Sequence, residues 1–104
     1  MQSSFAARHC EVADDLKLRA HDVMERLAQY PPHAIEGGVV FDVVPEGHQV
    51  ELKLHIPGGR WLVATAVETD HRTALDRAEE KLKKQLDRVV TNYRRDRHIA
   101  SELP

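Results

Sequence analysis

The sequence predicts an α+β fold in the order strand, helix, strand, strand, strand, helix (βαβββα), with the two helices packed side by side on one face of a four-stranded sheet. Two segments repeat apolar residues at helical spacing, and each has a single apolar stripe. Three strand-like runs lie between them, separated by turns rich in Pro and Gly. One run alternates strictly between apolar and polar residues, so one face of the sheet is expected to be buried.

The N-terminal part reads as an edge strand followed by a helix. Residues 2–8 form a short segment in which apolar and polar residues alternate weakly, which favours a strand at a sheet edge. Residues 14–29 then form an amphipathic helix, entered through Ala13 or capped by Asp14. The two prolines after Tyr30 end this helix, because a residue before proline is pushed out of the helical region. The crossover to the next strand should be parallel and right-handed.

The next three runs, residues 39–44, 48–56 and 60–68, predict a three-stranded antiparallel meander. Both Gly-Gly pairs, Gly37-Gly38 and Gly58-Gly59, are interpreted as turn residues. In residues 48–56 the apolar set faces the helices. In residues 60–68 the alternate residues with smaller side chains are assigned to the helix side, where short side chains allow a helix to approach the strand closely. These two sets are Val50, Leu52, Leu54 and Ile56, and Leu62, Ala64 and Ala66.

The second helix, residues 69–95, carries basic and apolar residues on opposite sides. At 100° per residue, its basic residues fall within roughly 40° of one line, opposite the apolar residues. We call this set the basic line; it comprises Arg77, Lys81, Lys84, Arg88 and Arg95. It spans roughly 27 Å at about 1.5 Å per residue, long enough to follow several phosphates of a nucleic acid. A polar face opposite a core is also ordinary, so the line alone does not decide between the two readings.

Four acidic residues of the same helix collect mainly on one outer flank. They are expected to pair with Lys83 and Arg77 of the helix itself. This set comprises Asp76, Glu79, Glu80 and Asp87.

The composition bounds the function. The 104 residues make one domain, residues 1–96, followed by a flexible tail, residues 97–104. No apolar run approaches the roughly 18 residues of a membrane span, and the N-terminus lacks the apolar region of a signal peptide, so a cytoplasmic protein is expected. The net charge of −2 argues against nucleic-acid binding by the whole surface but leaves room for a local basic patch.

No catalytic or metal-binding signature is present in the sequence. Phosphate-binding loops, nucleophile elbows and zinc-protease motifs are all missing. The single cysteine, Cys10, is interpreted as a small residue at a strand end. The seven histidines are scattered and expected to face solvent or lie in turns. We therefore predict no enzyme, no cofactor, no metal and no small-molecule substrate.

A series of spaced motifs runs from the meander into the second helix. They are His55-Ile56-Pro57-Gly58-Gly59, Leu62-Val63-Ala64-Thr65-Ala66, Asp70, Ala74-Leu75-Asp76, and Lys81-Leu82 with Gln85-Leu86. These motifs resemble the ribosome hibernation-promoting factor family, also called ribosome-associated inhibitor A or sigma-modulation protein. The resemblance covers about residues 1–95 and implies the same βαβββα fold.

The resemblance also implies a function: binding the small ribosomal subunit in the channel used by mRNA and tRNA, which silences translation during stress. Matching positions place Lys17, Arg26, Lys81, Lys84 and Arg88 against ribosomal RNA, and the basic line adds Arg77 and Arg95. The chain resembles the short form, without the further domain through which long members pair ribosomes. We expect a monomer away from the ribosome.

Some positions depart from the family pattern. Val23, Val90 and Asn92 stand where the family often has lysine, and Ala13 replaces the usual Ser or Thr cap. Each lost phosphate contact should weaken binding and flatten its salt dependence.

Two other functions fit part of the sequence. A divergent, non-RNA-binding member could act as a protein-interaction module, if Trp61, Val63 and Val67 joined Val40 and Val44 in one apolar patch on the open sheet face. A generic double-stranded-RNA-binding domain has a related layout. It is the weaker alternative, because the sequence lacks a separate basic loop to span two minor grooves.

Overall fold

The computed structural model describes the backbone of residues 1–102 and the side chains of residues 1–91. Its elements follow the predicted order. They are β1 (Gln2–Arg8), α1 (Asp14–Ala28), β2 (Glu36–Val44), β3 (Gly47–Ile56), β4 (Arg60–Glu68) and α2 (His71–Glu102).

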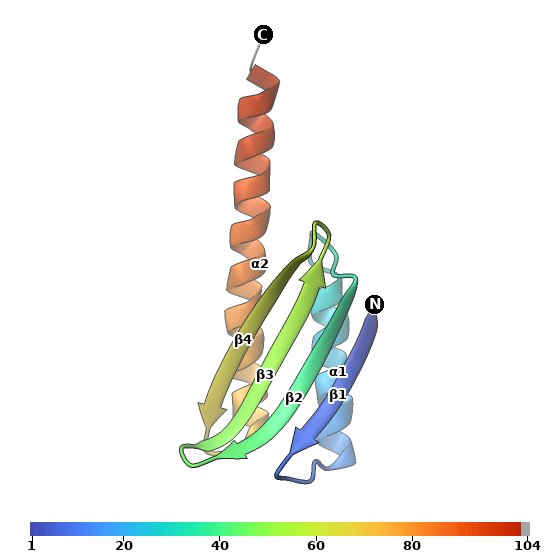
Figure 1. Ribbon diagram of the computed structural model, residues 1–104, viewed down its shortest axis with the longest axis vertical. Coiled ribbons are helices and arrows are strands. Elements are labelled where there is room, and N and C mark those ends of the chain that lie inside the picture. Colours follow the sequence, from blue (N-terminus) through green and yellow to red (C-terminus); the bar gives the residue numbers. More distant parts are fainter. Residues whose placement is uncertain (103–104) are drawn as a thin grey trace.

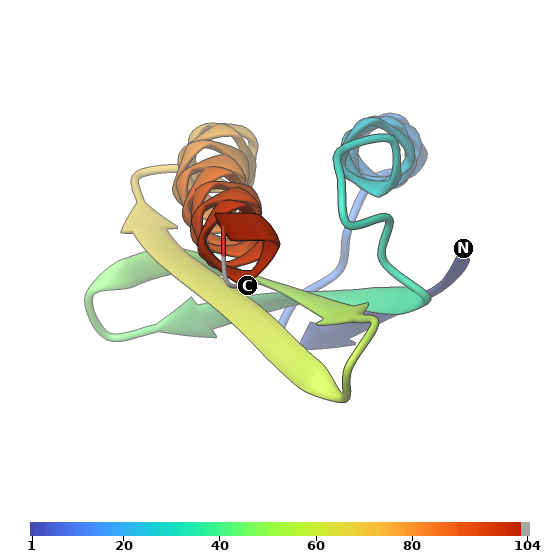
Figure 2. The same cartoon turned by 90° about the horizontal axis from the view of Figure 1, so that it is seen from above.

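The four strands form one sheet in the order β1-β2-β3-β4. β1 pairs parallel with β2, and the other two pairs are antiparallel, which confirms the parallel crossover and the meander. Both helices lie on the same face of the sheet (Figures 1 and 2). α2 packs over β3 and β4, and α1 lies beside it toward β2. The predicted α+β architecture is confirmed.

The core lies between the sheet and the two helices. The apolar set of β3 is buried, as predicted. On β4, Leu62, Ala64 and Ala66 face α2 and are each only 4% exposed, whereas Trp61 and Val63 lie on the open face. The small side chains of β4 meet small side chains of α2, including the buried Ala74 and Ala78, which allows helix and sheet to approach closely.

The prediction that Gly37-Gly38 forms a turn is wrong. Both glycines lie inside β2 and are buried, and Gly37 pairs with Leu54 of β3. A Cβ atom on Gly37 would collide with the terminal methyl group of Met24 on α1 and lie 2.9 Å from the Lys53 carbonyl oxygen. The glycine is required because a helix passes directly over the strand. Gly58 and Gly59 do form the predicted turn, with φ of 99° and 81°.

We expect Gly37→Ala to lower the free energy of unfolding by about 1–3 kcal/mol, because the added methyl group overpacks the contact between β2 and α1. Chemical denaturation of the purified variant measures this. Gly38→Ala is the matched control, since the only side-chain atom near its Cβ would be the Ser4 hydroxyl oxygen. A loss that is no larger at Gly37 than at Gly38 would contradict the packing argument.

The ends of α1 differ slightly from prediction. The helix begins after Ala13, which makes no side-chain capping hydrogen bond, and ends at Ala28 with Gln29 as its C-cap. The Ala13 entry is therefore confirmed, while capping by Asp14 is wrong.

α2 begins later and ends later than the predicted range 69–95. Asp70 caps its start: the Thr73 backbone N–H donates to Asp70 Oδ1 at 2.8 Å, and the Thr73 hydroxyl donates to Oδ2 at 3.0 Å. The helix then continues to Glu102, since residues 96–102 contain neither Pro nor Gly. Residues 103–104 lie outside the described residues, and a flexible tail over residues 97–104 stays an expectation.

The cap predicts a pH dependence. The hydrogen bonds from Thr73 hold the pKa of Asp70 below its ordinary value of 3.8, so the stabilisation is present at neutral pH and is lost as the pH falls through the lowered pKa. We expect Asp70→Ala to lower the melting temperature at neutral pH, with a difference that narrows in acid. Asp70→Asn retains a capping oxygen that does not titrate, so the Ala–Asn difference should persist in acid. Thermal unfolding followed by circular dichroism across the acid range measures both.

Candidate nucleic-acid interface

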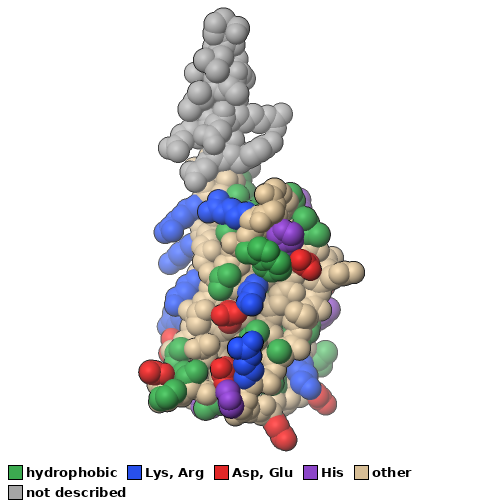
Figure 3. Space-filling model, viewed as in Figure 1, with side chains coloured by type: hydrophobic (Ala, Val, Ile, Leu, Met, Phe, Trp, Pro, Cys, Tyr) green, Lys and Arg blue, Asp and Glu red, His purple; other side chains and the backbone are tan. Residues whose placement is uncertain are grey.

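The described part of the basic line lies on the solvent side of α2. Arg77, Lys81, Lys84 and Arg88 are exposed, whereas Leu82 on the opposite side of the helix is fully buried. A column of Lys and Arg side chains follows the left edge of Figure 3, where α2 lies behind β4. The helix is therefore oriented as its periodicity predicts, and it holds these cations in one row.

The cations of the row differ in how free they are. Among the side chains of residues 1–91, Lys84 and Arg88 make no ion pair. Arg77 lies 3.5 Å from Glu80, one turn along the helix. Lys81 donates from Nζ to the Thr65 carbonyl oxygen of β4 at 2.8 Å. Lys84 and Arg88 thus present the least compensated positive charge to a ligand.

Arg26 of α1 is engaged in the seam between the helices. Its guanidinium donates to both carboxylate oxygens of Glu79 on α2, at 3.1 and 3.2 Å. Glu79 is only 8% exposed, and Lys83 lies 3.8 Å from the same carboxylate. The hydrogen bond to Glu79 raises the pKa of Arg26. The charge of Arg26 is therefore largely matched inside the free protein.

A second ion pair crosses the same seam. Arg19 donates to Asp76 at 2.8 Å, 57 residues away in the chain. The prediction that Asp76 and Glu79 lie on an outer flank with partners on their own helix is therefore wrong in part. α1 packs against that flank and supplies the arginines. The expected pairing with Lys83 and Arg77 holds for two of the four acids, since Glu79 pairs with Lys83 and Glu80 with Arg77.

The outward face of α1 carries mainly acidic side chains. Its basic residues turn to the two flanks, Arg19 and Arg26 toward α2 and Lys17 toward β1. The other exposed residues along the helix are Asp14, Asp15, Leu18, His21, Asp22 and Glu25. The two helices therefore do not present one joint basic surface, and the positive face belongs to α2.

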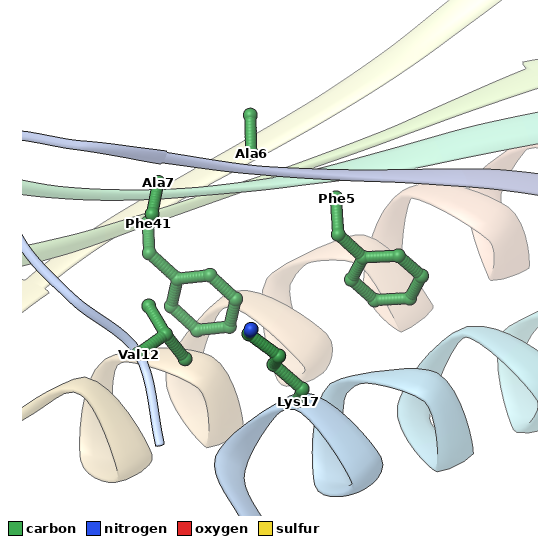
Figure 4. Close-up of a pocket in the computed structure, with 6 residues that line it drawn as sticks. All are labelled: Phe5, Ala6, Ala7, Val12, Lys17 and Phe41. Atoms are coloured by element: carbon green, nitrogen blue, oxygen red, sulfur yellow. The ribbon is translucent and has the colours of Figure 1, made fainter. Parts of the chain in front are cut away.

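Lys17 lies apart from the basic line. Its side chain reaches toward a pocket between α1 and β1, beside Phe5, Val12 and Phe41 (Figure 4). Its Nζ atom is 4.0 Å from Asp14. The structure thus separates Lys17 from Lys84 and Arg88 by the width of α1 and the helix seam.

Four further residues were expected at or near the RNA-facing surface. The structure describes the side chains of two of them, Val23 and Val90. Val23 is fully buried in the core, so the expectation that a phosphate contact is lost at this position is wrong. Val90 is half-buried on α2. The side chains of Asn92 and Arg95 lie outside the described residues, although α2 includes their backbone.

The open sheet face does not carry the continuous apolar patch of the alternative hypothesis. Val40 of β2 pairs with Glu51 of β3, which pairs with Thr65 of β4, so polar residues separate the valines of β2 from those of β4. Trp61 stacks on His55, with ring centroids 4.7 Å apart and planes at 8°. The exposed apolar residues of this face are therefore divided between two strands.

The fold gathers histidines that look unrelated in sequence. His71 is 9% exposed, and its Nε2 lies 2.8 Å from the Asp42 carbonyl oxygen, with the His48 ring perpendicular at 4.8 Å. The expectation that the histidines face solvent or lie in turns is thus wrong for His71, and no helical or strand spacing could have shown it. No group of three or more metal-ligating side chains lies together among the described residues.

Cys10 packs partly against the core just after β1. Burial, followed by the nearby charge of Asp42, raises the pKa of its thiol and so disfavours the reactive thiolate. This agrees with its interpretation as a small residue at a strand end.

Comparison with known proteins identifies the family. The family described as "Sigma 54 modulation protein / S30EA ribosomal protein" matches residues 4–94. The chain belongs to this family. Its members are ribosome-associated hibernation and translation-inhibition proteins and are not enzymes. The predicted family and the prediction of a non-enzymatic protein are therefore confirmed.

Two solved structures share the fold. The Thermus thermophilus Protein Y N-terminal domain is 23% identical, with a TM-score of 0.74 over 86% of this chain and 99% of that one. A "ribosomal subunit interface protein" from Coxiella burnetii is 16% identical, with a TM-score of 0.79 over 88% and 99%. No curated protein matches the sequence. Within the described residues, no helix is long and apolar enough to cross a membrane.

Proposed function

We propose that this protein binds the small ribosomal subunit in the channel otherwise used by mRNA and tRNA, and thereby silences translation in the cytoplasm. The observation that carries the proposal is the row of exposed cations on α2, in a chain that belongs to a ribosome-associated family. A structural relative is described as a ribosomal subunit interface protein.

The row suits a phosphate backbone. Arg77 and Arg88 are eleven residues apart, which is about 16 Å along a rigid helix at about 1.5 Å per residue. Side chains spaced by three or four residues project from one side of the helix and can neutralise successive phosphates without reading bases. RNA helices are recognised largely by shape and backbone charge, so a straight row of cations suffices.

The net charge of −2 makes the placement of charge decisive. The acidic outer face of α1 would repel phosphates, whereas α2 attracts them, so the free protein approaches RNA with α2 first. We assign the largest contributions to Lys84 and Arg88, smaller ones to Arg77 and Lys81, and an extension of the row to Arg95. Lys17 and Arg26 contribute least, because one lies beside β1 and the other is paired with Glu79.

The direct test is co-sedimentation of the purified protein with purified small subunits. We expect binding at low salt that weakens steadily as salt rises, because phosphate contacts release counterions. A tagged copy recovered from resting cells should bring down small-subunit RNA. Binding that is absent at low salt, with no small-subunit RNA recovered, would contradict the proposal.

A further inference from the structure

β4 is one of the two edge strands of the sheet, the one beneath α2. It pairs with β3 on one side only, since the strand order ends at β4. Residues 61–67, Trp-Leu-Val-Ala-Thr-Ala-Val, contain no charge, no Gly and no Pro. An uncharged edge strand rich in β-branched and aromatic residues is a template for pairing with another chain.

Two side chains of α2 occupy this edge. Lys81 donates from Nζ to the Thr65 carbonyl oxygen at 2.8 Å, and Gln85 donates from Nε2 to the Val63 carbonyl oxygen at 2.7 Å. Residues four apart on a helix are about 6 Å apart, close to the roughly 6.8 Å between alternate residues of a strand. The spacing of Lys81 and Gln85 therefore fits alternate outward-facing carbonyls of β4.

The edge is self-complementary. If a second copy paired antiparallel about Ala64, Arg60 of each copy would face Glu68 of the other at both ends of the new ladder. Val63 would face Thr65, and the outward-facing backbone groups of one copy would meet those of the other. The register thus places opposite charges together and no like charges.

We propose that β4 is a latent pairing surface for a second copy of this chain, and that Lys81 and Gln85 keep it closed. The two side chains occupy the carbonyl groups that an added strand would need. Gln85 belongs to the family-like Lys-Leu-x-x-Gln-Leu stretch, and its role at the sheet edge does not depend on ribosome binding.

The test is to measure the mass of the double variant Lys81→Ala/Gln85→Ala by sedimentation velocity over a dilution series. The wild-type chain is expected to sediment as a monomer of 11.8 kDa, and the double variant to shift toward twice that mass as concentration rises. Alanine retains helix propensity at both positions, so the variant should fold, which circular dichroism checks. Lys84→Ala/Arg88→Ala is the matched control on the outer side of α2 and should remain monomeric.

A charge swap tests the register. Adding Glu68→Arg to the double variant places Arg opposite Arg60 of the second copy and should restore the monomer. Adding Arg60→Glu as well should restore the dimer. A folded double variant that stays monomeric, a dimer that ignores both charge changes, or a wild-type chain that already dimerises would each overturn the proposal. Gln85→Glu, which sets a carboxylate against the Val63 carbonyl oxygen, is a second variant should the double variant not fold.

Discussion

Reversing Lys81, Lys84 and Arg88 to Glu is expected to abolish co-sedimentation with small ribosomal subunits at low salt. Three reversals, each changing the charge by two, take the net charge from −2 to −8 and replace the centre of the attractive row with repulsion. All three side chains are exposed, so the fold should survive. Sucrose-gradient sedimentation with purified subunits measures the loss.

The control is a second triple variant with the same net charge, in which the reversed residues lie away from α2. It reverses Arg8 and Lys53, which lie on the open sheet face, and Arg60, the exposed first residue of β4. These three reversals also give a net charge of −8. This variant should keep most of its binding. Equal loss in both triple variants would show that total charge matters rather than the row. Full retention by the first variant would remove the role assigned to α2.

Lys81 also closes the β4 edge, so its contribution is separated by a second variant. Lys84→Glu/Arg88→Glu leaves both hydrogen bonds from α2 to β4 in place. It should still lose most binding while remaining a monomer. Loss of binding without a change in mass therefore reports on RNA contact, and a change in mass without loss of binding reports on the edge.

Arg26→Ala should lower mainly the stability of the protein, whereas Lys84→Ala should weaken mainly its binding to RNA. Removing Arg26 takes a bidentate partner from the nearly buried Glu79, which should lower the free energy of unfolding by about 1–2 kcal/mol, since Lys83 remains as partial compensation. That corresponds to a melting temperature lower by roughly 4 °C or more in a domain of this size. Lys84→Ala should change stability by less than about 0.5 kcal/mol.

RNA binding should be affected more by Lys84→Ala than by Arg26→Ala. Losing one phosphate contact reduces the slope of log affinity against log salt by about 0.7–0.9, and we expect this for Lys84→Ala. Arg26→Ala should leave the slope nearly unchanged, because its charge is already matched by Glu79. Thermal unfolding and affinity measured over a salt series give both quantities. If Arg26→Ala flattened the slope as much as Lys84→Ala, the seam would have to open on the ribosome.

The sequence determined the features that depend on local spacing. The order of elements, the buried set of Val50, Leu52 and Leu54, and the outward side of α2 all follow from periods of two or 3.6 residues. The spaced motifs of the meander and second helix were sufficient to indicate the family.

Only the tertiary structure decided which side chains meet across elements. Arg26 and Glu79 are 53 residues apart, and nothing in the spacing of either helix shows that α1 packs on the acidic flank of α2. The buried place of Gly37 under Met24, and the burial of Val23, likewise depend on where α1 crosses the sheet. Periodicity gives the direction of a side chain relative to its own element, but pairing depends on the position of its neighbour. For that reason the sequence showed the basic line. It did not show which of its cations lack an ion-pair partner, which ion pairs join the two helices, or that Lys81 contacts β4.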